Sequence, residues 1–256
     1  MFNSRIIVAM PLAISYDGKG DMPNAAKQYI TFVELQPGQA QIAKNTIMRS
    51  PNVSKLFAEL ETQLYTKIQR GGGDEWLNDF LIWLYIQNKD FEGAMQQTKA
   101  IDRRKNENGF RVLNMARTAQ AEDFFDVAID GFDYIIKKGK DNALYFLART
   151  ELLYCRKAKI AKRINFSMDD VLGLKNDYES FIAESGRGLQ TAQSMKELAE
   201  LEVFYLHNIP AAIKLCEELL QMNGVPQQLK NKTKLLLGDC LLIDGDMWES
   251  SLLYGQ

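Results

Sequence analysis

The sequence predicts an all-α protein, a right-handed α-α superhelix made of about seven antiparallel helix pairs. Two observations lead to this prediction, beyond the apolar spacings of three and four that any amphipathic helix gives. Proline is scarce, with six in the chain, whereas a sheet-rich chain of this length would use more turn residues. A fixed order of small and aromatic residues also returns about every 34 residues, the sign of a repeat architecture.

The composition is that of a globular protein and limits the classes of function. Of 256 residues, 46% are hydrophobic and 25% are charged. The 31 basic and 33 acidic residues give a net charge of −2, which argues against nucleic-acid binding because such domains normally carry a basic excess. One histidine and three cysteines leave little material for a metal site or a catalytic triad. Phosphate-binding loops, nucleophile elbows and zinc-protease helices are missing from the sequence. We therefore expect no enzyme activity, no cofactor and no metal.

The compartment is left open by the sequence. Cys155, Cys216 and Cys240 are odd in number and widely spaced, so we expect buried reduced thiols rather than a disulfide framework. Residues 6–14 have the length of a signal-peptide core, but Pro11 interrupts them and they also fit a helix, which we favour. No apolar stretch approaches the roughly 18 residues of a membrane span. We expect a soluble protein, cytoplasmic or periplasmic, and a signal further upstream stays possible.

The repeat is clearest near the N-terminus, where Ala13, Tyr16, Ala25, Tyr29 and Pro37 follow one another. The small residues let two helix backbones approach closely, and the aromatic residues fill the space between successive pairs. The same order returns three times, at Leu81, Tyr85, Phe91, Ala94, Thr98 and Ile101, at Met115, Ala116, Ala119, Phe125, Ala128, Phe132 and Ile135, and at Leu237, Gly238, Leu241, Met247, Ser250 and Tyr254. Because one pair cannot bury both its faces, the units must stack.

The positions of the helices follow from the phase of this repeat and from residues typical of helix ends. We expect helices at about 4–18, 22–36, 39–49, 53–70, 75–88, 91–105, 109–121, 124–138, 141–163, 168–184, 189–206, 209–222, 226–243 and 246–256. Pro11 should kink the first helix or mark its start. Asp74 is expected to be an N-cap, Ser167 and Asp170 form a capping box, and Gly139 terminates a helix.

At these residues the chain resembles the tetratricopeptide-repeat family, and more widely its large uncharacterised bacterial members. The resemblance covers nearly the whole chain and implies a single solenoid domain, 1–256. Its repeats would lie at about 6–39, 40–74, 75–108, 109–142, 143–188, 189–226 and 231–256, the last of them truncated. Members of the family generally hold peptides or partner proteins on a concave face. The resemblance therefore implies a protein or peptide partner and a non-catalytic scaffold.

The resemblance places the candidate groove on the first helices of the central repeats. Its polar and aromatic residues would be Asp79, Trp83, Gln87, Asn114, Arg117, Gln120 and Arg149. The family's well-known clamps for a C-terminal carboxylate use lysines and asparagines here, and Asp79 has the wrong charge for that role. The alternatives are a solvated face without a ligand and, for Trp83 and Trp76, packing between repeats.

Three further features have simpler explanations than a ligand site. The basic run 156–163 fits a solvated helix end with cations near its C-terminal dipole. His207 fits a turn. The last repeat stops within its second helix, which indicates either a longer repeat protein or an open end, with Leu252, Leu253 and Tyr254 half exposed, that forms a homodimer. A second class of function, a helical accessory region of a larger enzyme or of a cell-envelope assembly complex, stays open as well.

Overall fold

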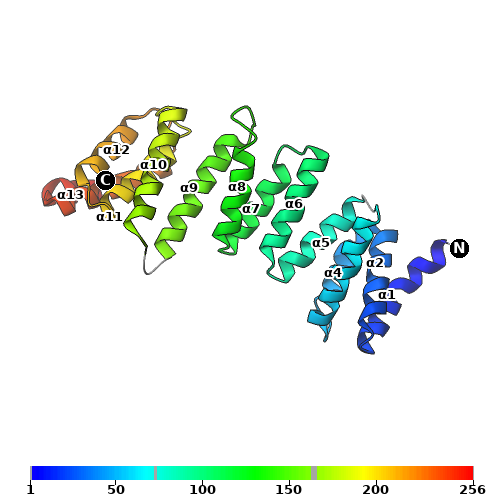
Figure 1. Cartoon of the computed structure of the whole chain (residues 1–256). Coiled ribbons are helices and arrows are strands. Elements are labelled where there is room, and N and C mark those ends of the chain that lie inside the picture. Colours follow the sequence, from blue (N-terminus) through cyan, green and yellow to red (C-terminus); the bar gives the residue numbers. More distant parts are fainter. Residues whose placement is uncertain (1, 72–73, 163–165, 256) are drawn as a thin grey trace. The chain divides into compact units, whose positions relative to one another are not determined.

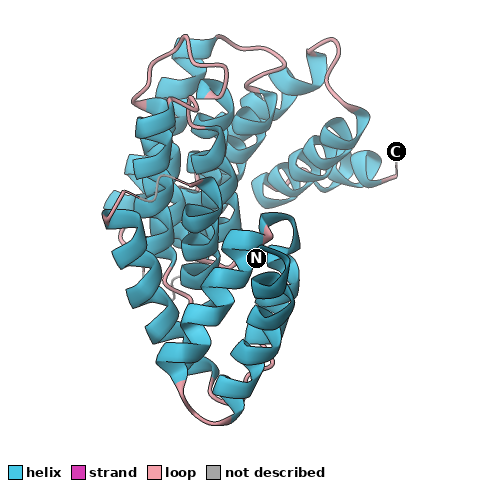
Figure 2. Cartoon of the chain, turned by 90° about the vertical axis from the view of Figure 1, so that its right-hand side faces the viewer, coloured by secondary structure: helices cyan, strands magenta, loops and turns pink. Residues whose placement is uncertain are grey.

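The computed structural model describes residues 2–71, 74–162 and 166–255, with side chains from Val8 onward. Within these residues the chain forms fourteen α-helices and one short 3-10 helix, and Figure 2 shows no strand among them. The helices are α1 (Phe2–Gly18), α2 (Met22–Leu35), α3 (Ala40–Ile47), α4 (Val53–Gln69), α5 (Glu75–Gln87), α6 (Phe91–Lys105), α7 (Phe110–Ala121), α8 (Phe125–Ile136), α9 (Tyr145–Lys162), α10 (Met168–Ser185), α11 (Ala192–Phe204), α12 (Ile209–Gln221), α13 (Gln227–Asp244) and α14 (Met247–Tyr254). The 3-10 helix η1 spans Pro37–Gln39. The predicted all-α class and its helix pairs are confirmed.

The chain divides into two compact units, residues 1–115 and 116–256, and the division falls within α7. The single solenoid domain 1–256 that the sequence predicts stays a prediction. We describe each unit by itself.

In unit 1, successive helices pack on one another in the order expected of stacked pairs. Helix α1 lies against α2, α4 against α5, and α5 against α6 (Figure 1). The degenerate repeat at 40–74 departs from this order, because its first helix α3 has only eight residues and its second helix α4 packs directly on α2. Two side chains of α3, Ala43 and Ile47, are buried, and the helix packs on α2.

Helix α1 is continuous through Pro11, so this proline does not mark the start of the helix. Proline there removes one backbone donor and crowds the preceding turn. Further along, α1 buries Ala9 and Ala13 against its neighbours. The apolar stretch 6–14 thus lies within a helix of the repeat array, as the sequence favours.

The small and aromatic repeat residues occupy the positions that the pattern predicts. Ala13, Ala25, Ala94 and Ala128 are completely buried. The rings of Tyr29 in unit 1 and of Phe132 in unit 2 are completely buried too. The alanines and these two rings are therefore buried as the pattern predicts, whereas Tyr16 and Tyr85 are half-buried and Tyr254 is exposed.

In unit 2, each helix from α8 to α14 packs on the next one along the chain. Two long helices, α9 and α10, make up the lengthened repeat at 143–188. The core continues through Tyr178 and Phe181 of α10 into α11 and α12. At the last pair, a Cβ atom on Gly238 would lie 2.8 Å from the Tyr254 ring, so the glycine makes room for that aromatic side chain.

The predicted helix ends agree with the structure in most places. Ser167 and Asp170 form a capping box at the start of α10, and Gly139 has φ +103° beyond the end of α8. Asp74 is the residue before α5, but its side chain makes no capping hydrogen bond. Its carbonyl oxygen accepts a hydrogen bond of 3.0 Å from Asn78 Nδ2 instead.

All three cysteines are buried and free, as the sequence predicts. Among the described residues, no helix is long and apolar enough to cross a membrane.

Candidate partner-binding surfaces

Trp83 is the centre of an aromatic cluster on α5. Its ring stacks on Phe80 with centroids 5.4 Å apart and an interplanar angle of 7°. Phe57 of α4 meets it edge-on at 6.1 Å. Lys44 of α3 places its Nζ 5.5 Å from the ring centroid, within the range of a cation–π interaction. Trp83 is half-buried and packs against the core of unit 1, so one part of its ring is fixed and another part faces solvent.

Asp79 lies one turn before Trp83 and is bound to Arg111. The Arg111 Nη1 donates to Asp79 Oδ1 at 2.5 Å, and its Nη2 donates to Glu75 Oε1 at 2.6 Å. Glu107 accepts from Nε of the same guanidinium at 2.9 Å. Arg111 therefore ties the first turn of α7 to α5 through Glu75 and Asp79, while Glu107 binds it from the preceding turn, so the Asp79 carboxylate is already paired.

Lys44, Asp79, Trp83 and Arg111 together form what we call the Trp83 face. They come from α3, α5 and α7, the first helices of three successive pairs. Burial lowers the pKa of Lys44, and the negative charge on Asp79 partly opposes this. The hydrogen bond to Glu107 raises the pKa of Arg111 despite its burial. This face therefore carries one aromatic ring with a cation, Lys44, over it, and a second cation, Arg111, that carboxylates already neutralise.

Arg117 and Gln120 meet at Glu151, a residue that the repeat pattern does not single out. Arg117 donates to Glu151 Oε1 of α9, at 2.7 Å from Nη2 and 3.1 Å from Nε. Gln120 Nε2 donates to Glu151 Oε2 at 3.2 Å. The two candidates thus join the first helices α7 and α9 within unit 2, and Glu151 occupies their donors.

The other predicted site residues have different surroundings. Arg149 lies over the Phe181 ring, 5.3 Å from its centroid, and 3.7 Å from Glu184 of α10. It lies two residues before Glu151, about 200° around α9, so it serves the α9–α10 pair rather than the α7–α9 contact. Gln87 is half-buried at the end of α5, and Asn114 is exposed on α7.

The basic run is paired rather than simply solvated. Arg156 contacts Asp177, Lys157 contacts Glu200, and Lys159 contacts Asp126. Lys162 lies 2.5 Å from Asp123, and Arg163 is outside the described residues. These cations connect α9 with other helices of unit 2, which an interpretation as a solvated helix end does not anticipate.

His207 is exposed in the turn between α11 and α12, with φ +52°. Among the residues that the structure describes, no three His, Cys, Asp or Glu side chains are grouped so that they could hold a metal ion.

Exposed apolar side chains are concentrated on α13 and α14, and we call this surface the C-terminal face. It includes Leu235, Leu242, Ile243, Met247, Trp248, Leu252 and Tyr254. Trp248 is 79% exposed and Met247 is 69% exposed. At the repeat position of Met247, Phe91 in unit 1 is only 1% exposed and Phe125 in unit 2 only 9%. The same position is thus covered inside the array and open here.

No protein-family model matches the sequence, and a search of the curated proteins finds no significant match. Among solved structures, the chain is similar to MamA at 14% identity, covering 67% of this chain and 88% of that one with a TM-score of 0.47. A tetratricopeptide repeat protein from Parabacteroides merdae is 12% identical over 98% of this chain and 91% of its own, with a TM-score of 0.41. The tetratricopeptide repeat domain of P58(IPK) is 15% identical over 100% of this chain and 73% of its own, with a TM-score of 0.32.

The helix pairs themselves, rather than these distant likenesses, define the class of protein. Paired helices, buried alanines at the close approaches and aromatic residues between the pairs make the chain all-α and tetratricopeptide-like.

Proposed function

We propose that the chain is a non-catalytic scaffold that binds a protein or peptide on the concave face made by its first helices, and that the Trp83 face is the central contact. The observation that supports this is the half-buried Trp83 ring, held between Phe80 and Lys44 on a surface that crosses three first helices. A rigid aromatic side chain loses little conformational entropy when it binds, which is why tryptophan is common among binding hot spots.

The charges beside the ring favour a particular kind of partner. Lys44 keeps its ammonium group close to the Trp83 ring, whereas Arg111 is already bound by three carboxylates. A partner that brings an apolar side chain onto the ring and an acidic group to Lys44 would match this surface. Within unit 1, Gln87 and Asn114 are further candidate contacts. Within unit 2, the candidate contacts on first helices are Arg117, Gln120 and Arg149.

The test is a peptide array followed by affinity measurements with the peptides that bind best. Trp83→Ala should weaken these peptides by at least tenfold, since removing a hot-spot side chain commonly costs ~2 kcal/mol or more. Trp248→Ala is the matched control, because it removes the same ring from a different surface. Peptides that bind wild type and Trp83→Ala equally would overturn the assignment of this face.

A second candidate function is association through the C-terminal face. Its support is the exposure of Met247 and Trp248 where internal repeats bury the corresponding position, since large apolar patches usually mark an interface. We propose that the occupant is a second copy of the chain, giving a homodimer. An adjoining part of an enzyme or of an envelope complex would be the other occupant, and it corresponds to the accessory-region alternative.

Sedimentation velocity over a range of protein concentrations tests this second proposal. Wild type should show a concentration-dependent dimer, and Trp248→Ser with Leu252→Ser should shift it to monomer. A clean monomer for wild type at high concentration would reject the homodimer and leave the face to another protein.

A further inference from the structure

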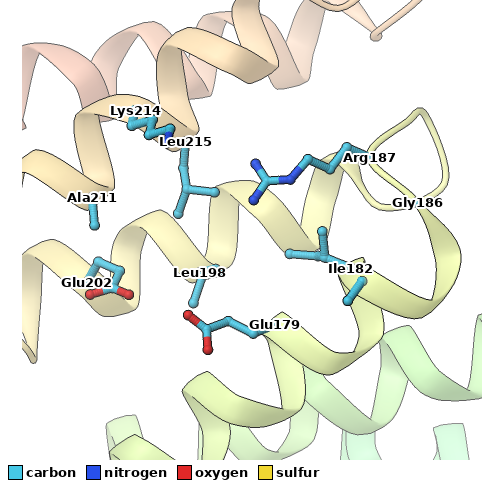
Figure 3. A pocket seen from close by; sticks show the side chains of 10 residues that line it. Glu179, Ile182, Gly186, Arg187, Leu198, Glu202, Ala211, Lys214 and Leu215 are labelled. Carbon is cyan, nitrogen blue, oxygen red and sulfur yellow. The ribbon is translucent and has the colours of Figure 1, made fainter.

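A pocket of about 490 Å³ lies between α10, α11 and α12 of unit 2. Figure 3 shows it from close by. Three helices and one loop line the pocket. The lining residues are Glu179, Ile182, Ala183 and Gly186 at α10 and its end, Arg187 in the following loop, Leu198 and Glu202 on α11, and Ala211, Lys214 and Leu215 on α12. Its volume is in the range of small-molecule and peptide side-chain pockets. Most of its lining comes from α10 and α12, the second helices of their pairs, and none of its residues belongs to the Trp83 face.

One edge of the pocket carries an excess of negative charge. Lys175 Nζ lies 2.8 Å from Glu202 Oε1 and 3.8 Å from Glu179 Oε1, so two carboxylates share one ammonium group. The Glu202 side chain is 3% exposed and also accepts from Asn208 Nδ2 at 3.1 Å, whereas the Glu179 side chain is 52% exposed. Glu179 is therefore the carboxylate that a ligand can reach.

The opposite edge carries an excess of positive charge. Arg187 is paired with Glu218. Lys214 is exposed and makes no ion pair with any residue that the structure describes. Figure 3 shows the carboxylates of Glu179 and Glu202 on one side and the cationic groups of Arg187 and Lys214 on the other.

Apolar side chains lie between the two charged edges. Leu198 and Ile182 are nearly buried, at 4% exposure each, and Leu215 is 8% exposed. Figure 3 shows all three between the charged groups. A ligand that fits this arrangement must place an apolar group between a cation and an anion.

We propose that this pocket is a second binding site, which takes an extended peptide segment of a partner protein with an apolar side chain between a basic and an acidic residue. The apolar side chain fills the space over Leu198 and Leu215. The basic residue pairs with Glu179, and the acidic residue pairs with Lys214. The occupant follows from charge complementarity, because a purely apolar or singly charged segment would leave one edge of the pocket unmatched.

The experiment is a nuclear magnetic resonance titration of the full chain with two blocked pentapeptides, Lys-Ala-Leu-Ala-Glu and its reverse, Glu-Ala-Leu-Ala-Lys. Both orders are used because the pocket does not fix the direction of the peptide backbone. We expect saturable shifts of the methyl groups of Ala183, Leu198, Ala211 and Leu215 with at least one peptide. Replacing the peptide leucine by serine should abolish these shifts.

The charge assignment is tested with Lys214→Glu and a matched control, Lys232→Glu, which makes the same charge change on α13 away from the pocket. Lys214→Glu should weaken the binding of the preferred peptide about three- to tenfold, the range expected for an exposed ion pair replaced by a like-charge pair. The same substitution should strengthen the binding of a peptide whose glutamate is changed to lysine. Lys232→Glu should change neither affinity.

Several outcomes would overturn the proposal. These are the absence of saturable shifts with either peptide, shifts confined to residues outside the pocket, or equal effects of Lys214→Glu and Lys232→Glu. Trp83→Ala should leave the titration unchanged, so failure here and failure of the Trp83 face are distinguishable.

Discussion

Two tyrosines, one in each unit, are completely buried, but their hydroxyl groups differ in hydrogen bonding. Tyr29 in unit 1 has no hydrogen-bond partner for its hydroxyl among the described residues. Tyr178 in unit 2 donates to Glu197 Oε2 at 2.8 Å, and Glu197 is itself buried. Unit 1 therefore uses its tyrosine as a large apolar filler, whereas unit 2 uses the equivalent burial to connect α10 with α11 through a polar bond.

The difference extends to the other buried carboxylates. In unit 1, Asp17 accepts from Ser50 Oγ at 2.7 Å and Asp102 accepts from the Gly109 backbone nitrogen at 2.6 Å, so both fix loops. In unit 2, Glu197 and Glu202 lie on α11 and bind side chains of α10. A repeat pattern that specifies the same apolar packing thus leaves each unit free to stabilise its helix contacts by different polar bonds.

The largest effect on stability is expected at Glu202, one of the two buried carboxylates of α11 that bind side chains of α10. Glu202→Ala removes a buried acceptor of Lys175 and Asn208 and should lower the free energy of unfolding by about 2–4 kcal/mol, measured by urea denaturation. Glu179→Ala is the matched control, because Glu179 lies near the same lysine but is half exposed. It should change stability by less than about 0.5 kcal/mol. Equal losses in the free energy of unfolding for both variants would show that the buried Glu202 contributes no more to stability than the exposed Glu179.

The next effect is at Tyr178. Tyr178→Phe keeps the ring but removes the hydroxyl that donates to buried Glu197, which keeps the hydrogen bond of 2.7 Å from Gln193 Nε2. The substitution should lower the free energy of unfolding by about 1–3 kcal/mol. Burial raises the pKa of Tyr178 well above its ordinary value, and Glu197 adds to this rise, so the hydroxyl stays a donor at neutral pH. Chemical denaturation of the two proteins side by side is the measurement. A cost below about 0.5 kcal/mol would mean that the polar bond adds little to the packing.

The acid sensitivity of unit 2 should come in part from Glu200. Burial pulls the pKa of Glu200 upward, but hydrogen bonds from Lys157 and Lys196 outweigh it and hold the pKa below its ordinary value. A carboxyl with a lowered folded-state pKa contributes stability above its unfolded-state value, which is lost as the pH falls through the folded-state pKa. The free energy of unfolding should therefore decline below about pH 4.5. Glu200→Gln should reduce that decline, and identical pH profiles for both proteins would contradict the assignment.

The smallest effect on the free energy of unfolding is expected at Tyr29. Tyr29→Phe removes a buried hydroxyl without a described partner, so it should be neutral or stabilise the protein by up to about 1 kcal/mol. Burial, with a smaller contribution from Asp17, raises the pKa of Tyr29 to about 12, so no charge is lost in this substitution at neutral pH. Thermal unfolding monitored by circular dichroism is sufficient. A loss comparable to that of Tyr178→Phe would reveal a hydrogen bond at Tyr29 in solution.

Much of the fold could be predicted from the sequence because the repeat is a local pattern. Residues such as Ala25, Ala94 and Phe132 need only their spacing to be recognised as close approaches and filled gaps. The site could be predicted only in part. Asp79 and Trp83 follow from the phase of one helix, but their partners Arg111 and Lys44 lie on other helices.

Lys44 lies in the degenerate repeat, where no spacing identifies a first helix. Glu151 and the charged edges of the pocket could not be predicted for a different reason. Acidic residues are scattered along the chain, and only the packing of the helices from α7 to α12 decides which of them meet a cation.

The positions of the three tryptophans allow intrinsic fluorescence to report on separate parts of the chain. Trp76 and Trp83 are half-buried on α5, each with a lysine over its ring, and Trp248 is largely exposed on α14. Iodide should quench the emission of Trp248 before that of the other two. In Trp248→Phe, all the remaining indole fluorescence comes from unit 1, so a single dye-free unfolding curve would follow that unit alone.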